Sequence, residues 1–164
     1  MNIVYGLSAV KFAGKEIGYI DNNGIQPAGT APTRTPIYAA QKKDGPIINL
    51  MSSPGATAFN ITLVDLNAEG LVATIGGEKD TSGNYTPPKN AEKSGVMDFE
   101  ADSGHTIRLF NARVSLNDFA NGLNSSNLLG LQLHIEVEAD ESGKTWKMFA
   151  PGINPATGQP VVEG

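Results

Sequence analysis

The clearest pattern along the chain is a change of hydrophobic period within residues 57–77. Apolar and polar side chains alternate over residues 57–66, which predicts a β-strand with one apolar face. That face carries Phe59, Ile61 and Leu63. Beyond this strand the apolar positions recur at helical spacing, so we expect a short helix to follow the strand directly.

The expected helix has sequence signals at both ends. Asn67 is a favourable N-cap, while Gly76 and Gly77 allow the left-handed backbone that often ends a helix. Gly70 lies inside the helix, where glycine costs about 1 kcal/mol relative to Ala, so packing against the rest of the fold must stabilise this element. The apolar residues that we expect to provide that packing are Leu66, Leu71, Val72 and Ile75.

Similar alternation elsewhere predicts roughly eight strands in total. Residues 2–12 and 15–20 are expected to form a β-hairpin around Ala13 and Gly14, with both faces of the first strand covered. The other expected strands span residues 35–43, 47–51, 96–101, 105–116, 129–137 and 144–149.

The last expected strand, residues 144–149, carries two further predictions. Residues 140–143 are expected to turn the chain back, so that the lysines of this strand lie across from Glu136 or Glu138. Trp146 is expected to pack in the core, because a carbohydrate-binding platform ordinarily shows several exposed aromatic side chains.

Three segments rich in proline, glycine or polar residues separate or follow the strands. We interpret residues 21–36 as a loop or extended arm, residues 78–94 as a long polar connection, and the chain from Pro151 onward as a flexible arm. The sequence therefore predicts one mainly β domain over residues 1–150, with one short helix and long loops, followed by a C-terminal arm over residues 151–164.

Length and composition restrict the possible functions. The 164 residues suffice for one domain that buries roughly 70% of its unfolded surface. The absence of cysteine excludes disulfides and thiol chemistry. A net charge of −5, with no basic run longer than Lys42-Lys43, disfavours nucleic-acid binding through phosphate neutralisation. The sequence lacks a basic leader with an apolar run and any apolar stretch of about 18 residues, so neither a signal peptide nor a membrane span is expected.

The sequence offers little catalytic chemistry. His105 and His134 show no metal-binding or nucleophile-activating spacing, and we interpret both as solvated or interface side chains. Asp98, Glu100 and Asp102 alternate along one strand face, whereas a general acid and base need two carboxyl groups in different environments. We interpret these three as a solvated or channel-facing acidic face, and we expect no enzyme activity, catalytic residue, cofactor or metal.

The order of these elements resembles the tail tube (major tail) proteins of long-tailed bacteriophages. The segments that carry the resemblance are residues 10–20, 59–66 and 75–77. The resemblance implies an antiparallel β-sandwich or barrel with one short flanking α-helix. It also implies that six copies close into a ring and that rings stack into a hollow tube for DNA delivery. The long loops 21–36 and 78–94 and the arm after Pro151 would then connect neighbouring rings.

The same resemblance implies partners and a location. The chain would be a homo-oligomer in the virion tail, assembled in the host cytoplasm with tape-measure and tail terminator or baseplate proteins. DNA would pass through the lumen without specific binding, and no membrane would be involved. Because a negatively charged conduit repels phosphates, the candidate lumen-facing acids are Asp98, Glu100, Glu136 and Glu138. The candidate residues for packing the helix at the subunit seam are Leu66, Leu71, Val72 and Ile75.

One alternative from another functional class stays open. A non-catalytic β-sandwich module that binds a ligand or decorates a capsid would be a stable monomer or trimer, with Trp146 or Tyr85 contributing to a saturable site. The tube subunit also accounts for the acidic strand faces and for apolar sheet edges, which strand pairing between copies would close.

Overall fold

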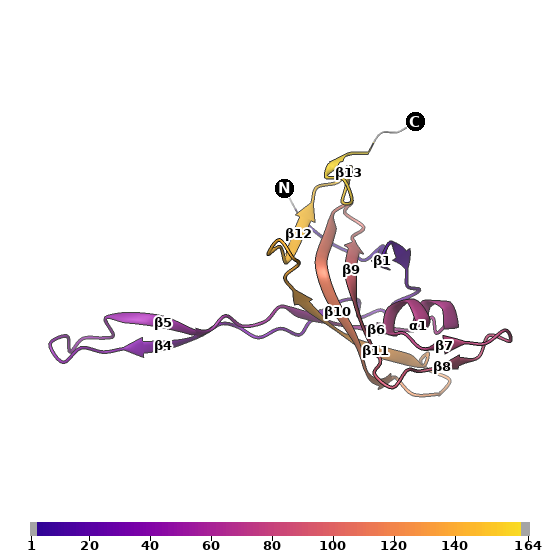
Figure 1. Cartoon of the computed structure of the whole chain (residues 1–164), viewed down its shortest axis with the longest axis horizontal. Helices are drawn as coiled ribbons and strands as arrows, with labels where there is room; N and C mark the ends of the chain where they lie inside the picture. Colours follow the sequence, from indigo (N-terminus) through magenta and orange to yellow (C-terminus); the bar gives the residue numbers. More distant parts are fainter. Residues whose placement is uncertain (1–2, 162–164) are drawn as a thin grey trace.

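One antiparallel sheet organises most of the chain in the computed structural model, which describes residues 3–161 (Figure 1). Its strands are β1 (Ala9–Phe12), β2 (Lys15–Glu16), β3 (Gln26–Pro27), β6 (Ala58–Leu63), β9 (Glu92–Glu100), β10 (Thr106–Ala120), β11 (Gly130–Glu138) and β12 (Trp146–Phe149). Their order is β2-β1-β9-β10-β11-β6-β3, and β12 pairs with β10. Residues 3–161 contain one short helix, α1 (Ala68–Ile75). The expected mainly β fold with one flanking helix is therefore confirmed.

The long strand β10 is the centre of the sheet, because it pairs with β9 along one side and with both β11 and β12 along the other. The expected turn at residues 140–143 forms, with the Asp140 amide donating to the Lys144 carbonyl, but the expected pairing of the next strand with β11 is wrong. These residues form a loop that leaves the sheet, after which β12 continues along β10, so that Lys147 lies across from Arg108 and not from the glutamates of β11. Trp146 is half exposed and is not a core residue, because β12 extends past the end of the core.

The two edges of the sheet approach each other. The chain leaves β2 at one edge, where the Ile17 amide donates to the Val10 carbonyl, and it reaches β6 at the other edge within a few residues. There Ile20 pairs with Leu63, and the Asp21 amide donates to the Thr62 carbonyl. These hydrogen bonds curl the sheet around its apolar side, in agreement with the expected sandwich or barrel class.

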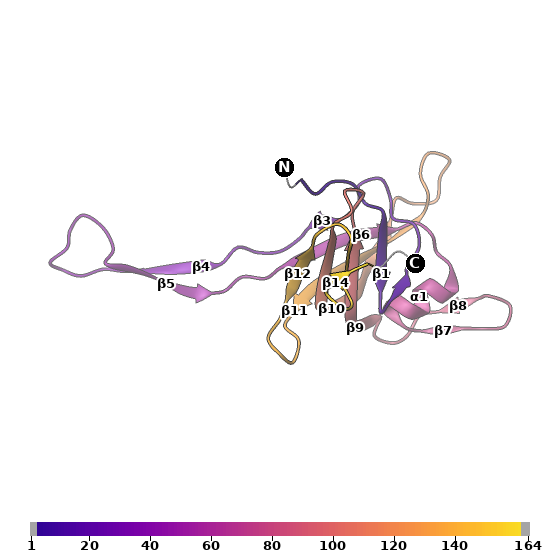
Figure 2. The ribbon, with the colours of Figure 1, turned by 90° about the horizontal axis from the view of Figure 1, so that it is seen from above.

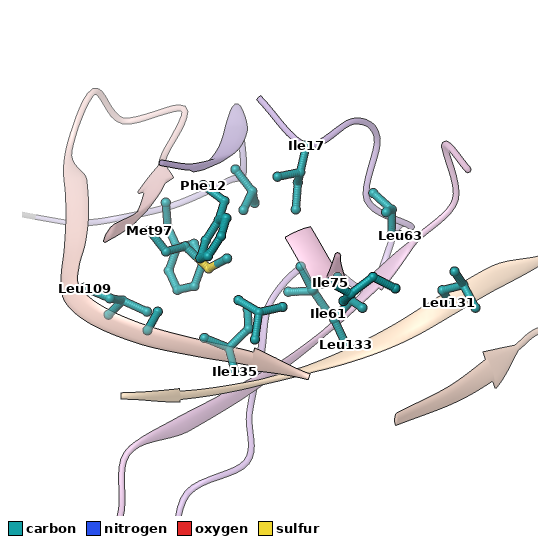
Figure 3. Close-up of a cluster of buried hydrophobic side chains, with 14 of the residues drawn as sticks. Phe12, Ile17, Ile61, Leu63, Ile75, Met97, Leu109, Leu131, Leu133 and Ile135 are labelled. Atoms are coloured by element: carbon teal, nitrogen blue, oxygen red, sulfur yellow. The ribbon is translucent and has the colours of Figure 1, made fainter. Parts of the chain in front are cut away.

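The core fills the inside of the curled sheet, and α1 closes it (Figure 3). Its fully buried side chains come from five strands, from α1 and from the segment after β2, and include Val10, Ile17, Ile61, Leu63, Ile75, Met97, Leu109, Val114, Leu133 and Ile135. Phe59 and Phe99 meet edge to face with ring centroids 5.4 Å apart. Apolar side chains on one face of each strand thus produce one continuous core.

The helix α1 forms as its sequence signals predict. The Asn67 side-chain oxygen accepts a 2.6 Å hydrogen bond from the Gly70 amide, and Gly76 ends the helix with a φ of 85°. A Cβ atom on Gly70 would lie 3.0 Å from the Ile17 carbonyl oxygen, so a close approach of the backbone explains the glycine inside this helix. Leu71 and Ile75 are buried side chains of this helix.

The N-terminal hairpin is shorter than the sequence suggests. Ala13 and Gly14, with φ values of 53° and 83°, form the expected turn between β1 and β2. The prediction of a covered strand over residues 2–12 is wrong for residues 3–8, because pairing of β1 with β9 stops at Glu100, and residue 2 lies outside the described part of the chain. Residues 3–8 therefore run beyond the sheet, where Tyr5 is exposed.

A second, two-stranded sheet projects away from the core (Figures 1 and 2). It consists of β4 (Thr33–Ile37) and β5 (Ile48–Ser53), and a bridge between Thr30 and Ala56 joins its two strands near the main sheet. We call residues 30–56 the arm. Strands were expected at 35–43 and 47–51, but β4 starts earlier and ends at Ile37, so the projecting element is a hairpin rather than the loop 21–36.

Two small hairpins complete the described chain. They are β7 (Glu78–Lys79) with β8 (Tyr85–Thr86), and β13 (Ile153–Asn154) with β14 (Gln159–Pro160). The first lies in the expected connection 78–94, whose last residues, from Glu92, already belong to β9. The second lies in the expected C-terminal arm, whose residues 162–164 are outside the described part of the chain.

Candidate assembly surfaces

The four acids proposed for the lumen lie on one face of the main sheet. Asp98 and Glu100 point outward from β9, because their neighbour Phe99 is in the core. Glu136 and Glu138 point outward from β11 in the same way, on either side of a partly buried Val137. The sheet therefore brings these carboxylates together on its outer face, opposite α1.

Asp98 is not the solvated acid that the sequence suggested. Its side chain is 9% exposed, and its two oxygens accept hydrogen bonds of 2.8 and 3.0 Å from Arg108. The same hydrogen bonds raise the pKa of the Arg108 guanidinium. Asp98 cannot repel a passing polyanion as a free charge, because Arg108 neutralises it within the sheet surface.

Basic side chains also accompany the other acids of the outer face. Glu100 lies 2.8 Å from Lys11, and Glu138 lies 2.7 Å from Arg113, which also contacts Glu92. The hydrogen bond from Arg113 lowers the pKa of Glu138. Glu136 is 3.6 Å from His134 Nε2 and is more than half exposed. The outer face therefore carries several ion pairs, and Glu136 is the most solvated of the four acids.

The helix residues separate into two groups. Leu71 and Ile75 are 4% and 0% exposed within the chain, so they pack α1 on its own sheet and cannot meet another subunit. Leu66 and Val72 are partly buried and keep some accessible surface. The predicted packing of the helix is thus confirmed for Leu71 and Ile75. The prediction that these two side chains also contact a neighbouring subunit is wrong.

The two histidines make local hydrogen bonds. His105 Nδ1 is 3.0 Å from the Ser103 hydroxyl across a hairpin turn, and His134 Nδ1 is 2.8 Å from the Asn60 side-chain oxygen on the neighbouring strand. Across residues 3–161, no three His, Cys, Asp or Glu side chains gather in a way that could hold a metal ion. Within the same residues, no helix is both long enough and apolar enough to span a bilayer.

The arm exposes both of its strands to solvent, since every residue of β4 and β5 is exposed. Its large apolar side chains are 37–67% exposed: Ile37, Tyr38, Ile47, Ile48, Leu50 and Met51. The arm also contains three basic and one acidic side chain, a net charge of +2 in a chain of −5, so the rest of the chain carries −7. The arm differs from the remaining surface in both apolarity and charge.

A cleft of about 700 Å³ opens where the N-terminal segment crosses the end of the core. The apolar side chains in its lining include Val4, Leu7, Ile20, Ile25, Phe59 and Ile107. The acidic residues in its lining are Asp21 and Glu100, and none of the lining residues within 3–161 is a lysine or arginine. Sequence reasoning missed this cleft because its walls come from five separate segments.

The signal for the arm was present in the sequence. Two strand-like segments flank residues 38–47, and proline- and glycine-rich stretches separate that unit from the neighbouring strands on both sides. Such flanks indicate a hairpin that pairs with itself rather than with the main sheet.

Comparison of the chain with known protein families gives no match, and comparison with curated protein sequences gives none either. The function therefore has to be argued from the surfaces described above.

Proposed function

We propose that this protein is a structural, non-catalytic subunit of a bacteriophage tail tube. Copies of the chain close into rings, six to a ring, and the rings stack into a channel through which DNA is delivered without specific binding. The tube belongs to the virion tail and forms in the host cytoplasm with tape-measure and tail terminator or baseplate proteins.

The projecting arm is the observation that carries this proposal. An isolated two-stranded hairpin is marginally stable in water, and exposed apolar strands with free edges promote aggregation. The arm has both properties, and no other segment within residues 3–161 covers its two strands. A subunit that is completed by its neighbours accounts for such an element, because the arm then gains its packing from another copy.

The main sheet supports the same proposal. Polar and charged side chains cover its outer face, and α1 packs on the opposite side. A one-layer sheet with a hydrophilic outer face can border an aqueous channel without exposing its core. The basic side chains of this face are paired with carboxylates, so they do not form a broad basic surface. The face therefore has little capacity to neutralise the phosphates of a DNA backbone.

Negative-stain electron microscopy of the purified protein at high concentration tests the proposal. We expect rings or stacked tubes, either alone or after addition of a tape-measure partner. A protein that stays monomeric under all of these conditions would contradict the proposal.

The cleft favours one alternative, a non-catalytic binding or capsid-decoration module. Its volume is within the range that encloses small ligands, and Trp146 is exposed on the strand β12. Such a module would be a stable monomer or trimer that binds a ligand saturably, and replacement of Trp146 would abolish binding. Tyr85 is a poorer candidate, because its hydroxyl donates to the Gly76 carbonyl at the end of α1.

A further inference from the structure

We infer that the cleft receives the tip of the arm from a second copy of this chain. The tip comprises residues 37–48, the loop between β4 and β5 with one residue from each strand. This inference rests on the proposed function and names the surface on which the arm docks.

The arm cannot reach the cleft of its own chain, because it projects away from the main sheet (Figures 1 and 2). Its tip exposes Ile37, Tyr38 and Ile47 to solvent. The cleft has apolar side chains in its lining at the end of the core, and it is open to solvent among the residues that the structure describes. Two accessible apolar surfaces that cannot meet within one copy can meet between two copies.

The apolar surface of the cleft continues onto β12. Ile107 lines the cleft and pairs across the sheet with Met148, so their side chains share one face. Met148 and Trp146 are 47% and 50% exposed on that face. The continuous surface is thus wider than the cleft alone and can accommodate a hairpin tip that carries several large side chains.

Charge favours the same pairing. Lys42, Lys43 and Asp44 lie in the tip, which therefore has a net charge of +1. Among residues 3–161, the charged residues in the lining of the cleft are both acidic, Asp21 and Glu100. Glu100 already pairs with Lys11, whereas within residues 3–161 the side chain of Asp21 hydrogen-bonds only to Asn23 in its own turn. A lysine from the tip would supply the missing cation.

Cysteine crosslinking tests the inference directly, because the natural chain contains no cysteine. Tyr38→Cys places a thiol on the tip, and Asn22→Cys places one at the exposed rim of the cleft. The matched control combines Tyr38→Cys with Ser125→Cys, a residue of an equally exposed loop that also presents apolar side chains, those of Leu123 and Leu128. Both double variants are treated with a short bismaleimide after assembly.

The Tyr38→Cys/Asn22→Cys chain should give a ladder of covalent oligomers beyond the dimer, because each copy donates a tip and receives another. The Ser125 control should give dimers at most. Lys42→Glu with Lys43→Glu should reduce the ladder several-fold, whereas Lys89→Glu, on an exposed lysine outside the arm, should not.

The outcomes separate this inference from the proposed function. Rings or tubes without the ladder, or with an equal ladder in the control, would overturn the docking site and leave the tube subunit standing. A ladder in a protein that forms neither rings nor tubes would support the docking site and overturn the tube. A protein that shows neither would contradict both.

Discussion

The ion pair between Asp98 and Arg108 gives the most specific energetic prediction. Asp98 was a candidate for a free acid on a channel wall, and in that role its replacement would leave folding unchanged. In the structure its side chain is 9% exposed and that of Arg108 is 18% exposed, and two hydrogen bonds join them. Loss of one partner therefore leaves a nearly buried charge without its counter-ion.

Removal of one partner from a buried pair costs about 3–5 kcal/mol. We expect Arg108→Met to fall at the lower end of this range, because Lys11 lies nearby. The pKa of Lys11 is raised by its hydrogen bond with Glu100 and, to a smaller extent, by the charge of Asp98. A loss of about 3 kcal/mol is a large part of the 5–15 kcal/mol that stabilises an ordinary domain. The double variant Asp98→Leu/Arg108→Met, which removes both charges, should recover most of it.

Urea unfolding of the single and double variants measures these differences. Arg113→Met is the matched control, since this arginine also forms ion pairs across the outer face, with Glu92 and Glu138, but is 44% exposed. Solvent and salt screen an exposed pair, so the control should change the free energy of unfolding far less. An Asp98→Leu chain as stable as the natural protein would refute the reasoning and restore Asp98 as a free surface acid.

Three further predictions concern the core, the turns and the channel. Ile75→Ala should lower the free energy of unfolding by about 2–5 kcal/mol, because Ile75 is 0% exposed. Val72→Ala on the same helix should lower it much less. Equal losses of stability in thermal unfolding would contradict the packing of α1 on the sheet. Hydrogen bonds, chiefly from the Lys144 amide, lower the pKa of Asp140. This stabilisation is present above the unfolded pKa of about 3.9 and is lost as the pH falls through the folded value. In Asp140→Asn the free energy of unfolding should therefore decrease less steeply as the pH is lowered. An unchanged decrease would exclude this contribution of Asp140. Glu136→Lys should slow DNA ejection from virions with intact tubes, and normal ejection would remove this face from the lumen.

Local signals in the sequence predicted the elements whose limits depend on neighbouring residues. The cap at Asn67, the alternation of β6 and the turn at Ala13-Gly14 all form as expected, since each depends on contacts within a few positions. The same holds for the core face of β11, where alternation distinguishes the inside from the outside of the sheet.

The features that depend on distant pairing could not be predicted in this way. The alternation around Asp98 places it on the outer face, but only the register between β9 and β10 brings Arg108 against it. Residues 140–143 have a turn composition whether the chain reverses or continues along β10. The cleft depends on how the N-terminal segment crosses the strand ends, which the sequence pattern does not encode locally.

The role of the arm in assembly is the central claim, and removal of the arm tests it most directly. Thr30 and Ala56 already exchange two backbone hydrogen bonds, of 2.9 and 3.0 Å, so an Asn-Gly turn can replace residues 31–55 without disturbing the main sheet. Sedimentation and electron microscopy of the natural and shortened chains at equal concentration should then be compared. Our account predicts rings or tubes for the natural chain and a folded monomer or isolated rings for the shortened one. Stacked tubes from the shortened chain would contradict it.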